Sequence, residues 1–325
     1  MRIGPFKKSK ENIQSVDVLI IGGNLTGIST AFNLANKLKI MVVDKSFIGN
    51  NLFNKIQTVA VNNFNHKKIS NIFSEKYTNM YFNFLLETTD ILRDNIIKND
   101  LRCNLLVGNK DEDKNIYFSD NGVYKTKNLT FNLKEYVLGL KKLCLEKNII
   151  IKEYKKVLNI TKKKNSYKCK TNKGIIMASK VIVACHDFKN LLPLSLFLRV
   201  YKCNDKLFTN DGLPYVGCFK PGNNTLLISY GYNNNVIENS VLASKVLRDL
   251  IIEEENPLVP LLSLNRHTNI YNLQFVPINV CKNLKNSFTN KYVLGKSKIR
   301  QISLQLKEHK INFSNIVLLL KERVK

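Results

Sequence analysis

The sequence lacks several features that would assign the protein to a particular class. It contains no Trp and only 4 His, and no apolar stretch approaches the roughly 18 residues of a membrane-spanning helix. The N-terminus, MRIGPFKKSKENIQS, has no apolar segment of the kind that signal peptides carry. The 7 Cys form no CxxC pair, so neither a disulfide framework nor a cysteine metal site is indicated. We expect a soluble, cytoplasmic protein that binds no metal.

Acidic residues are also scarce. Lys and Arg together number 51 against 25 Asp and Glu, and the formal net charge is +26. Such a charge suggests a nucleic-acid or anionic-membrane partner. However, 43 of the basic residues are Lys and 8 are Arg, whereas nucleic-acid sites rely on Arg for bidentate contacts. Because the Lys residues are also spread along the whole chain, we expect neither partner. A basic nucleic-acid-binding protein stays open as the weakest alternative.

The first 45 residues contain the clearest local pattern. Residues 16–21 (VDVLII) and 40–43 (IMVV) predict buried strands, and residues 25–38 have the apolar spacing of a helix. A strand, a glycine turn, a helix and a strand within about 30 residues form a βαβ unit.

The turn in this unit, GGNLTG at 22–27, has the position and glycine spacing of a dinucleotide-binding turn. Asn24 occupies its middle glycine position, where a side chain would intrude on a phosphate. Asp44 ends the second strand and is placed to accept hydrogen bonds from ribose hydroxyls, which favours FAD or NAD(H) over NADP. A plain structural βα turn with a solvated Asp44 is the alternative.

Further elements follow along the chain. Helical spacing predicts helices at 69–99, 133–147, 238–253 and 313–322. Strands are predicted at 149–154, 156–160, 180–184 and 225–229, and a hairpin joins 167–171 to 175–177 through a turn at 172–174. Residues 110–127 are polar and predict a loop or a short hairpin.

Several of these segments, in this order, resemble flavoproteins of the D-amino-acid oxidase and glycine oxidase superfamily. The similar blocks are DVLIIGGNLTGISTAFNL with VVDKSFIG, LTFNLKEYVLGLKKLC with IIIKEYKKVLNI, KVIVACHDF, TNDGLPYVG, SYGYNNNVIENSVLASKVLRDLI and ENPLVPLLSLNR, spanning 17–266. The likeness is greatest to bacterial members that often carry a C-terminal Rieske domain. A Rieske cluster needs C-x-H and C-x-x-H pairs, and no His of this sequence has Cys two or three positions before it. We therefore expect no Rieske cluster in this chain.

The resemblance implies an α/β fold with FAD as cofactor. A Rossmann-type domain would be assembled from discontinuous segments 1–109, 129–186 and 209–266. Residues 110–128 and 187–208 would be remnants of a reduced antiparallel α+β substrate domain, and 267–325 a C-terminal extension. It identifies no catalytic residue. The implied cofactor-binding residues are Gly22, Gly23, Asn24, Leu25, Thr26, Gly27, Asp44, Lys45, Val157, Ala184, Cys185, Asp211, Gly212, Gly231, Val236 and Glu238.

Two departures from the family pattern leave the activity open. Val236 and Glu238 stand where the flavin-capping loop carries Gly and Thr, and a carboxylate there would oppose negative charge on the reduced flavin. Only 26 residues separate the predicted strand at 180–184 from Asp211, which leaves little substrate domain. The first hypothesis is an FAD-dependent oxidoreductase that passes hydride from an amine-like or other small substrate to flavin N5. The alternative is a degenerate, catalytically weak or inactive flavoprotein fold that serves as a binding or scaffold protein.

Overall fold

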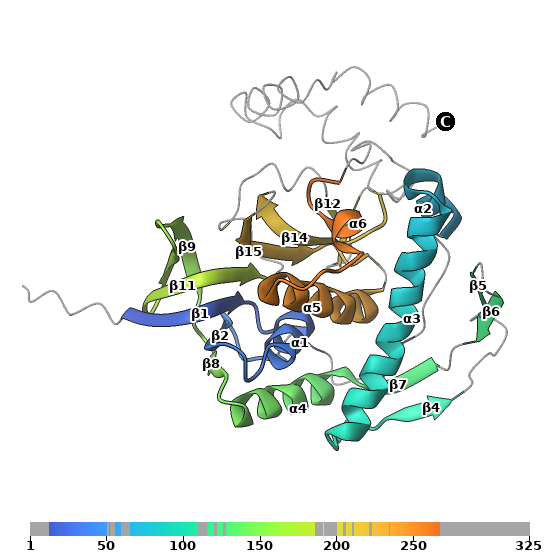
Figure 1. The fold of residues 1–325 in the computed structure, drawn as a ribbon. Coiled ribbons are helices and arrows are strands. Elements are labelled where there is room, and N and C mark those ends of the chain that lie inside the picture. Colours follow the sequence, from blue (N-terminus) through green and yellow to red (C-terminus); the bar gives the residue numbers. More distant parts are fainter. Residues whose placement is uncertain are drawn as a thin grey trace, which may run out of the picture.

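The computed structural model describes residues 13–50, 52, 56–59, 66–108, 116–119, 122–125, 128–185, 191, 200–203, 206–209, 211–220, 223–233 and 235–266. The predicted helix at 313–322 and the proposed extension 267–325 lie outside these residues. Figure 1 shows the arrangement of the described elements.

A mixed sheet forms the centre of the molecule, in the order β14-β15-β11-β1-β2-β8 (Figure 1). Its strands are β14 (Tyr215–Lys220), β15 (Asn223–Tyr230), β11 (Gly174–Val183), β1 (Ile13–Ile21), β2 (Ile40–Val43) and β8 (Ile150–Lys152). All neighbouring pairs are parallel except β14 with β15. The Rossmann-type sheet built from segments far apart in the sequence is therefore confirmed.

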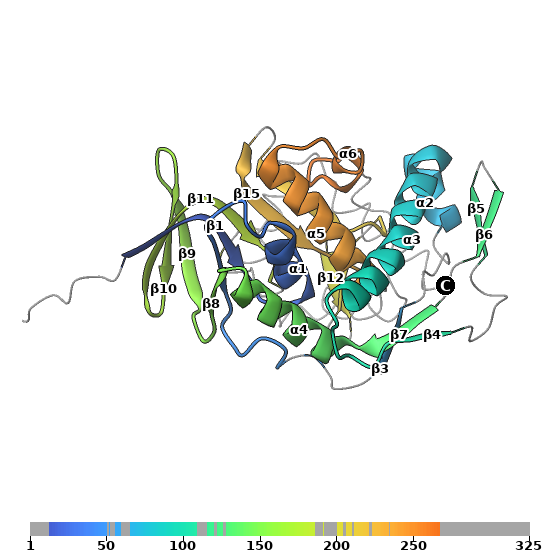
Figure 2. The ribbon, with the colours of Figure 1, turned by 60° about the horizontal axis from the view of Figure 1, so that its bottom comes forward.

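Each face of this sheet has its own cover. Val18 and Ile20 of β1 face an apolar core shared with the helices α1 (Leu25–Asn33), α4 (Leu133–Glu146) and α5 (Val236–Ile252). Leu19 and Ile21 face a second core shared with the hairpin of β9 (Val157–Lys162) and β10 (Tyr167–Thr171). Figure 2 shows the three helices side by side. Because both faces are covered, β2 and the last four residues of β1 are continuous apolar runs.

Smaller antiparallel pieces lie beside this core. The long helix α3 (Glu75–Lys98) packs against α5 and follows the short helix α2 (His66–Phe73). Near α3, a three-stranded sheet runs in the order β3-β7-β4 (Figure 2). The remaining strands and helix are β3 (Ile56–Val59), β4 (Leu106–Gly108), β5 (Ile116–Ser119), β6 (Gly122–Lys125), β7 (Asn128–Asn132), β12 (Val200–Cys203), β13 (Lys206–Thr209) and α6 (Val259–Leu262).

Three predicted elements differ in the structure. The helix predicted at 69–99 is two helices, because Ser74 has a positive φ of 73°, which a continuous helix does not allow. The strands predicted at 175–177 and 180–184 are one strand, β11, which pairs with β10 over its first half and with β1 along its length. The first helix ends at Asn33, and Asn36 is left-handed with φ of 68°, so the chain turns before residue 38.

Candidate functional site

A cavity of about 160 Å³ lies at the carboxyl ends of β1 and β2. In parallel α/β sheets, ligands bind in the crevice at this edge. Six of the predicted cofactor residues line it: Gly22, Asn24, Asp44, Lys45, Val157 and Cys185. Sequence reasoning missed five others: Ile21, Val43, Lys155, Lys156 and Leu191.

Hydrogen bonds within the cavity wall fix the Asp44 carboxylate. Its Oδ2 accepts a bond from the Gly23 N–H at 2.7 Å, and its Oδ1 accepts bonds from Ser46 N at 2.8 Å and Ser46 Oγ at 2.9 Å. Each carboxylate oxygen can accept two bonds, so Oδ1 is filled and Oδ2 can still accept one more.

The Asn24 side chain acts as the N-cap of α1. Its Oδ1 accepts a bond from Gly27 N at 3.0 Å, and its Nδ2 donates to Ala184 O at 2.5 Å, at the end of β11. Asn is a favoured N-cap because its side chain satisfies an N–H that the helix cannot pair. The side chain thus ties the turn to the sheet, and one N–H at the start of α1 is already used.

Close backbone packing explains two glycines of the turn. Gly22 has φ of 112°, and a Cβ there would lie 2.9 Å from the Ala184 carbonyl oxygen. A Cβ at Gly27 would collide with the carbonyl oxygen of Gly22. Leu25 and Thr26 complete the turn as buried residues of the first turn of α1. The turn therefore needs glycine at 22 and 27 for the contact between α1, β1 and β11.

Three lysines make the cavity basic: Lys45, Lys155 and Lys156. Lys155 is buried, and its Nζ donates to Gln14 Oε1 at 3.0 Å. Burial lowers the pKa of Lys155, and the charges of Lys152 and Lys173 lower it further. Lys155 N also bonds the Asp44 carbonyl oxygen at 2.8 Å, which places the lysine pair beside Asp44. Lys155 and Lys156 directly precede Val157, which was predicted to contact the cofactor. This position was the signal by which the sequence could have indicated them.

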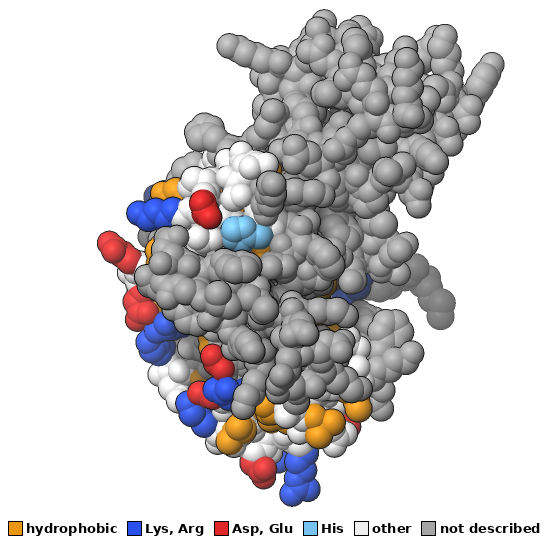
Figure 3. All heavy atoms as spheres, turned by 90° about the vertical axis from the view of Figure 1, so that its right-hand side faces the viewer, with side chains coloured by type: hydrophobic (Ala, Val, Ile, Leu, Met, Phe, Trp, Pro, Cys, Tyr) orange, Lys and Arg blue, Asp and Glu red, His pale blue; other side chains and the backbone are white. Residues whose placement is uncertain are grey.

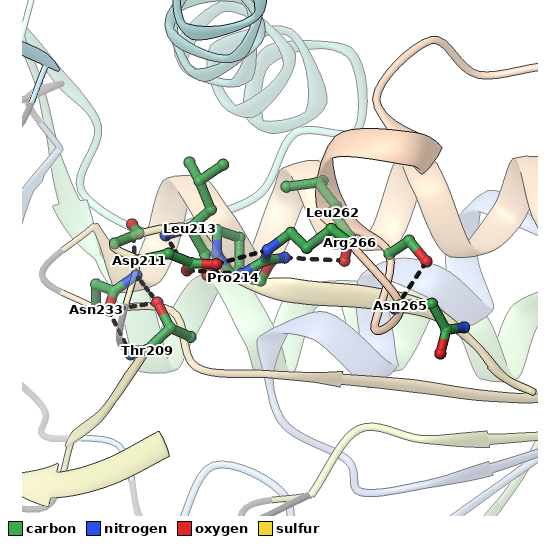
Figure 4. A network of polar contacts seen from close by, with 10 residues as sticks. Thr209, Asp211, Leu213, Pro214, Asn233, Leu262, Asn265 and Arg266 are labelled. Carbon is green, nitrogen blue, oxygen red and sulfur yellow. Dashed lines mark hydrogen bonds and ion pairs between the residues drawn. The ribbon is translucent and has the colours of Figure 1, made fainter. Parts of the chain in front are cut away.

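The predicted residues Asp211 and Gly212 lie apart from this cavity's lining, in a turn that precedes β14 (Figure 4). Asp211 is fully buried, and its carboxylate forms a bidentate ion pair with Arg266, with Nε–Oδ2 of 2.7 Å and Nη2–Oδ1 of 2.8 Å. Leu213 N donates to the same Oδ1 at 3.1 Å. The sequence alone indicated no role for Arg266, which lies 55 residues away.

A second predicted segment, beginning at Gly231, meets this turn. Asn233 Nδ2 donates to Gly212 O at 2.8 Å, and Asn233 Oδ1 accepts from Thr209 N at 2.9 Å. The structure therefore brings together the segments around Asp211 and Gly231, which the resemblance assigns to the flavin. Asn233 itself was not singled out from the sequence.

Tyr232 connects this turn region to the dinucleotide turn. Its hydroxyl lies 2.7 Å from Thr26 Oγ1 in α1 and 2.8 Å from Ser229 Oγ in β15. Burial raises the pKa of Tyr232 to about 12, against smaller opposite effects of those two hydrogen bonds. The phenol is thus a neutral link between the two groups of predicted residues.

The last two predicted residues lie in the first turn of α5. Val236 is its first residue and packs against the main apolar core. Glu238 is only 5% exposed. Burial raises the pKa of Tyr81 on α3 well above its usual value, and the charge of Glu238 adds to that rise. The structure thus places a buried carboxylate in the first turn of α5. This is the residue at which the sequence departs from the Thr of the family pattern.

Two absences hold for the described residues alone. No helix among them is long and apolar enough to cross a membrane. Nor do they bring three His, Cys, Asp or Glu side chains together in a way that could hold a metal ion.

Comparison with solved structures assigns the fold. Glycine oxidase from Bacillus cereus matches 78% of this chain and 99% of its own, with a TM-score of 0.55 and 16% identity. NikD, an unusual amino acid oxidase essential for nikkomycin biosynthesis, matches 79% and 100%, with a TM-score of 0.54 and 11% identity. Glycine oxidase from Geobacillus kaustophilus has the same TM-score at 13% identity. The described chain has the fold of the amino acid oxidases.

At the level of fold, these neighbours confirm the resemblance to the D-amino-acid oxidase and glycine oxidase superfamily. No model of a known protein family matches the sequence. Among curated proteins, the probable oxidoreductase OrdL of Haemophilus influenzae is 23% identical over 224 residues, which are 57% of this chain and 52% of that protein. The match thus spans about half the length of that relative.

Proposed function

We propose that the protein is an FAD-dependent oxidoreductase of the D-amino-acid oxidase superfamily. The observation that carries this proposal is the basic cavity beside Asp44, at the ligand-binding edge of a sheet that has the fold of the amino acid oxidases. A dinucleotide carries two phosphates and two sets of ribose-type hydroxyls, so it suits a site that combines a fixed carboxylate with lysines.

The groups that line the cavity fit the ADP half of FAD. The Asp44 carboxylate can accept a hydrogen bond from a ribose hydroxyl, and Lys45, Lys155 and Lys156 can offset the charge of the pyrophosphate. Val43 and Val157 supply apolar surface for a base. The N-terminus of α1 adds backbone N–H groups and the positive end of its dipole.

The chain's contribution to the reaction is binding and orientation. Bound FAD would supply the chemistry, as its N5 accepts hydride from an amine-like or other small substrate. Asp44 and the lysines would hold the ADP half, while the turn at Asp211 and the start of α5 would position the flavin half. We assign no general acid or base, because Asp211 and Arg266 are engaged with each other.

The absorbance spectrum of the purified protein tests this proposal. We expect the two visible flavin bands, in the protein as isolated or after addition of FAD. A protein that stays colourless and takes up no added FAD would contradict it.

Cys185 offers a second test that needs no turnover. Its thiol lines the cavity and is partly exposed, so bound ADP should slow its alkylation by iodoacetamide. The matched control is Cys218, which is also partly exposed but lies outside the cavity, and its alkylation should not respond to ADP. Asp44→Ala should abolish the protection of Cys185.

One observation favours the alternative of a degenerate flavoprotein fold that binds or scaffolds without turnover. Asn24 Oδ1 already occupies the Gly27 N–H at the phosphate turn, and the side chain lines the cavity. Asn24→Gly combined with Val236→Gly tests it. A rise of FAD affinity by orders of magnitude would support the degenerate fold, and unchanged affinity would show that the departures are tolerated.

We also propose that the partner is a small molecule and that the protein acts in the cytoplasm. Cys103, Cys144 and Cys169 are buried thiols, as is common where the surroundings are reducing. On the described part of the face beside α3, basic and acidic side chains lie next to one another and form no patch of one sign (Figure 3). A nucleic-acid titration at two salt concentrations tests the remaining alternative, since phosphate binding depends steeply on salt.

A further inference from the structure

Arg266 holds the turn from Asp211 to Pro214 with four of its five donors and binds α6 with the fifth. Besides the two bonds to Asp211, its Nη1 donates to Pro214 O at 2.7 Å and Leu262 O at 3.2 Å, and its Nη2 donates to Leu213 O at 2.8 Å. A guanidinium has five N–H groups, so all five are used (Figure 4). Arg266 in this arrangement has no donor left for a substrate carboxylate.

The ion pair between Arg266 and Asp211 is shielded from water. The Arg266 and Asp211 side chains are 2% and 1% exposed, and the guanidinium lies 3.7 Å from the centroid of the Tyr215 ring. Burial alone would lower the pKa of Arg266, but the charge of Asp211 holds that pKa above its usual value. A buried charge is costly unless it is paired and fully hydrogen-bonded, so the turn can take only the position that completes these bonds.

Asn233 holds the same turn from the other side. Its backbone is left-handed with φ of 54°, a conformation that Asn tolerates, and this turns its amide toward Gly212 and Thr209 (Figure 4). The residue before it, Tyr232, bonds Thr26 at the start of α1. The turn at Asp211 is therefore fixed relative to the dinucleotide turn as well as to α6.

We propose that Arg266 and Asn233 are positioning residues that fix the Asp211–Pro214 turn for the flavin half of the cofactor, without contributing to the hold on the ADP half. This inference rests on the proposed function. In this proposal Asp211 does not contact the ligand itself. Its carboxylate holds the turn in place by binding Arg266 and the Leu213 N–H. The turn would act on the flavin through its backbone position.

Two variants test the proposal, each measured for FAD affinity, ADP affinity and the visible spectrum of bound flavin. Arg266→Lys keeps the charge but loses the planar fork that serves five acceptors. Asn233→Gly keeps the left-handed backbone and removes the amide. We expect each variant to bind FAD at least 10-fold more weakly and to shift the flavin bands, while its ADP affinity stays within 2-fold of wild type. Asn148→Gly is the matched control, because Asn148 is exposed and also left-handed, with φ of 61°.

The outcomes separate this inference from the proposed function. A wild-type protein that takes up no FAD would contradict both. If the wild type binds FAD, and the variants bind FAD and ADP as it does with the same spectrum, only the inference is overturned. Equal losses of FAD and ADP affinity would also overturn it, since they indicate a general structural role. If Arg266→Lys does not fold, Asn233→Gly decides, because glycine accepts the backbone conformation at 233.

Discussion

The cavity beside Asp44 and the turn at Asp211 are both marked by the sequence as cofactor segments, yet they use their charges differently. In the cavity, the carboxylate is held by N–H and O–H groups of Gly23 and Ser46, and three lysines are among the other lining residues. At the turn, the carboxylate is fully buried against a guanidinium from a distant segment. An aspartate in a cofactor segment can thus line a cavity, as Asp44 does, or hold the backbone in place, as Asp211 does. The groups that bind its carboxylate determine which role it has.

The largest effect should come from breaking the buried pair. Asp211→Asn leaves the Arg266 charge without its counter-charge, so the free energy of unfolding should fall by about 3–5 kcal/mol. Urea denaturation measures this fall. Asp90→Asn is the control, because Asp90 pairs with Arg93 at 3.0 Å but is 66% exposed, and exposed pairs contribute about 1 kcal/mol or less. Equal losses in the two variants would show that the turn is not held as described.

The turn beneath the cavity should be nearly as sensitive, for a steric reason. Gly27→Ala forces α1 away from the Gly22 carbonyl, and we expect a loss of about 2–3 kcal/mol in the free energy of unfolding. In Gly139→Ala, the new Cβ meets only the end of the Leu101 side chain, so stability should change by about 1 kcal/mol or less. A stable Gly27→Ala protein would mean that α1 and β1 approach less closely than the structure shows.

Local signals predicted the cavity side well. The buried runs of β1 and β2 and the glycine turn between them act within a short stretch of chain, and the structure confirms the unit. The capping role of Asn24 was also within reach, because Asn precedes a helix and Gly27 N lies three residues on. The intrusion on a phosphate expected from Asn24 stays a prediction, since its side chain lines the cavity and its oxygen already accepts the Gly27 N–H.

Long-range partners explain what the sequence did not reveal. Nothing near Arg266 in the chain indicates that its donors serve Asp211, Leu213 and Pro214, more than 50 residues earlier. Likewise, β11 continues past the polar pair Ser179–Lys180 because β1 pairs along that stretch, and no local apolar pattern shows this. The break at Ser74 depends on a backbone conformation that the periodicity of α2 and α3 does not encode.

A smaller, pH-dependent effect should appear at the link between the two regions. Tyr232→Phe removes the hydrogen bonds to Thr26 and Ser229 and should cost about 1–2 kcal/mol at pH 8. The pKa of Tyr232 is raised from 10.0 to about 12 on folding. Its contribution to stability is therefore complete below pH 10 and is lost as the pH rises toward 12, by about 2–3 kcal/mol. Urea denaturation at pH 8, 10 and 11 should show the gap between wild type and variant closing, and a constant gap would contradict this assignment.

The smallest effect on stability is expected at Lys156, where a substitution should mainly weaken ADP binding. Lys156 is exposed at the cavity, so Lys156→Gln should change the free energy of unfolding by about 0.5 kcal/mol or less. Because its charge faces the site proposed for the pyrophosphate, ADP should bind about 3-fold more weakly, with a weaker dependence on salt. Lys164→Gln makes the same change of charge at an exposed position outside the cavity lining and should leave ADP affinity unchanged. If the two variants lose affinity equally, the attraction comes from the net charge of the protein, and the cavity lysines have no separate role.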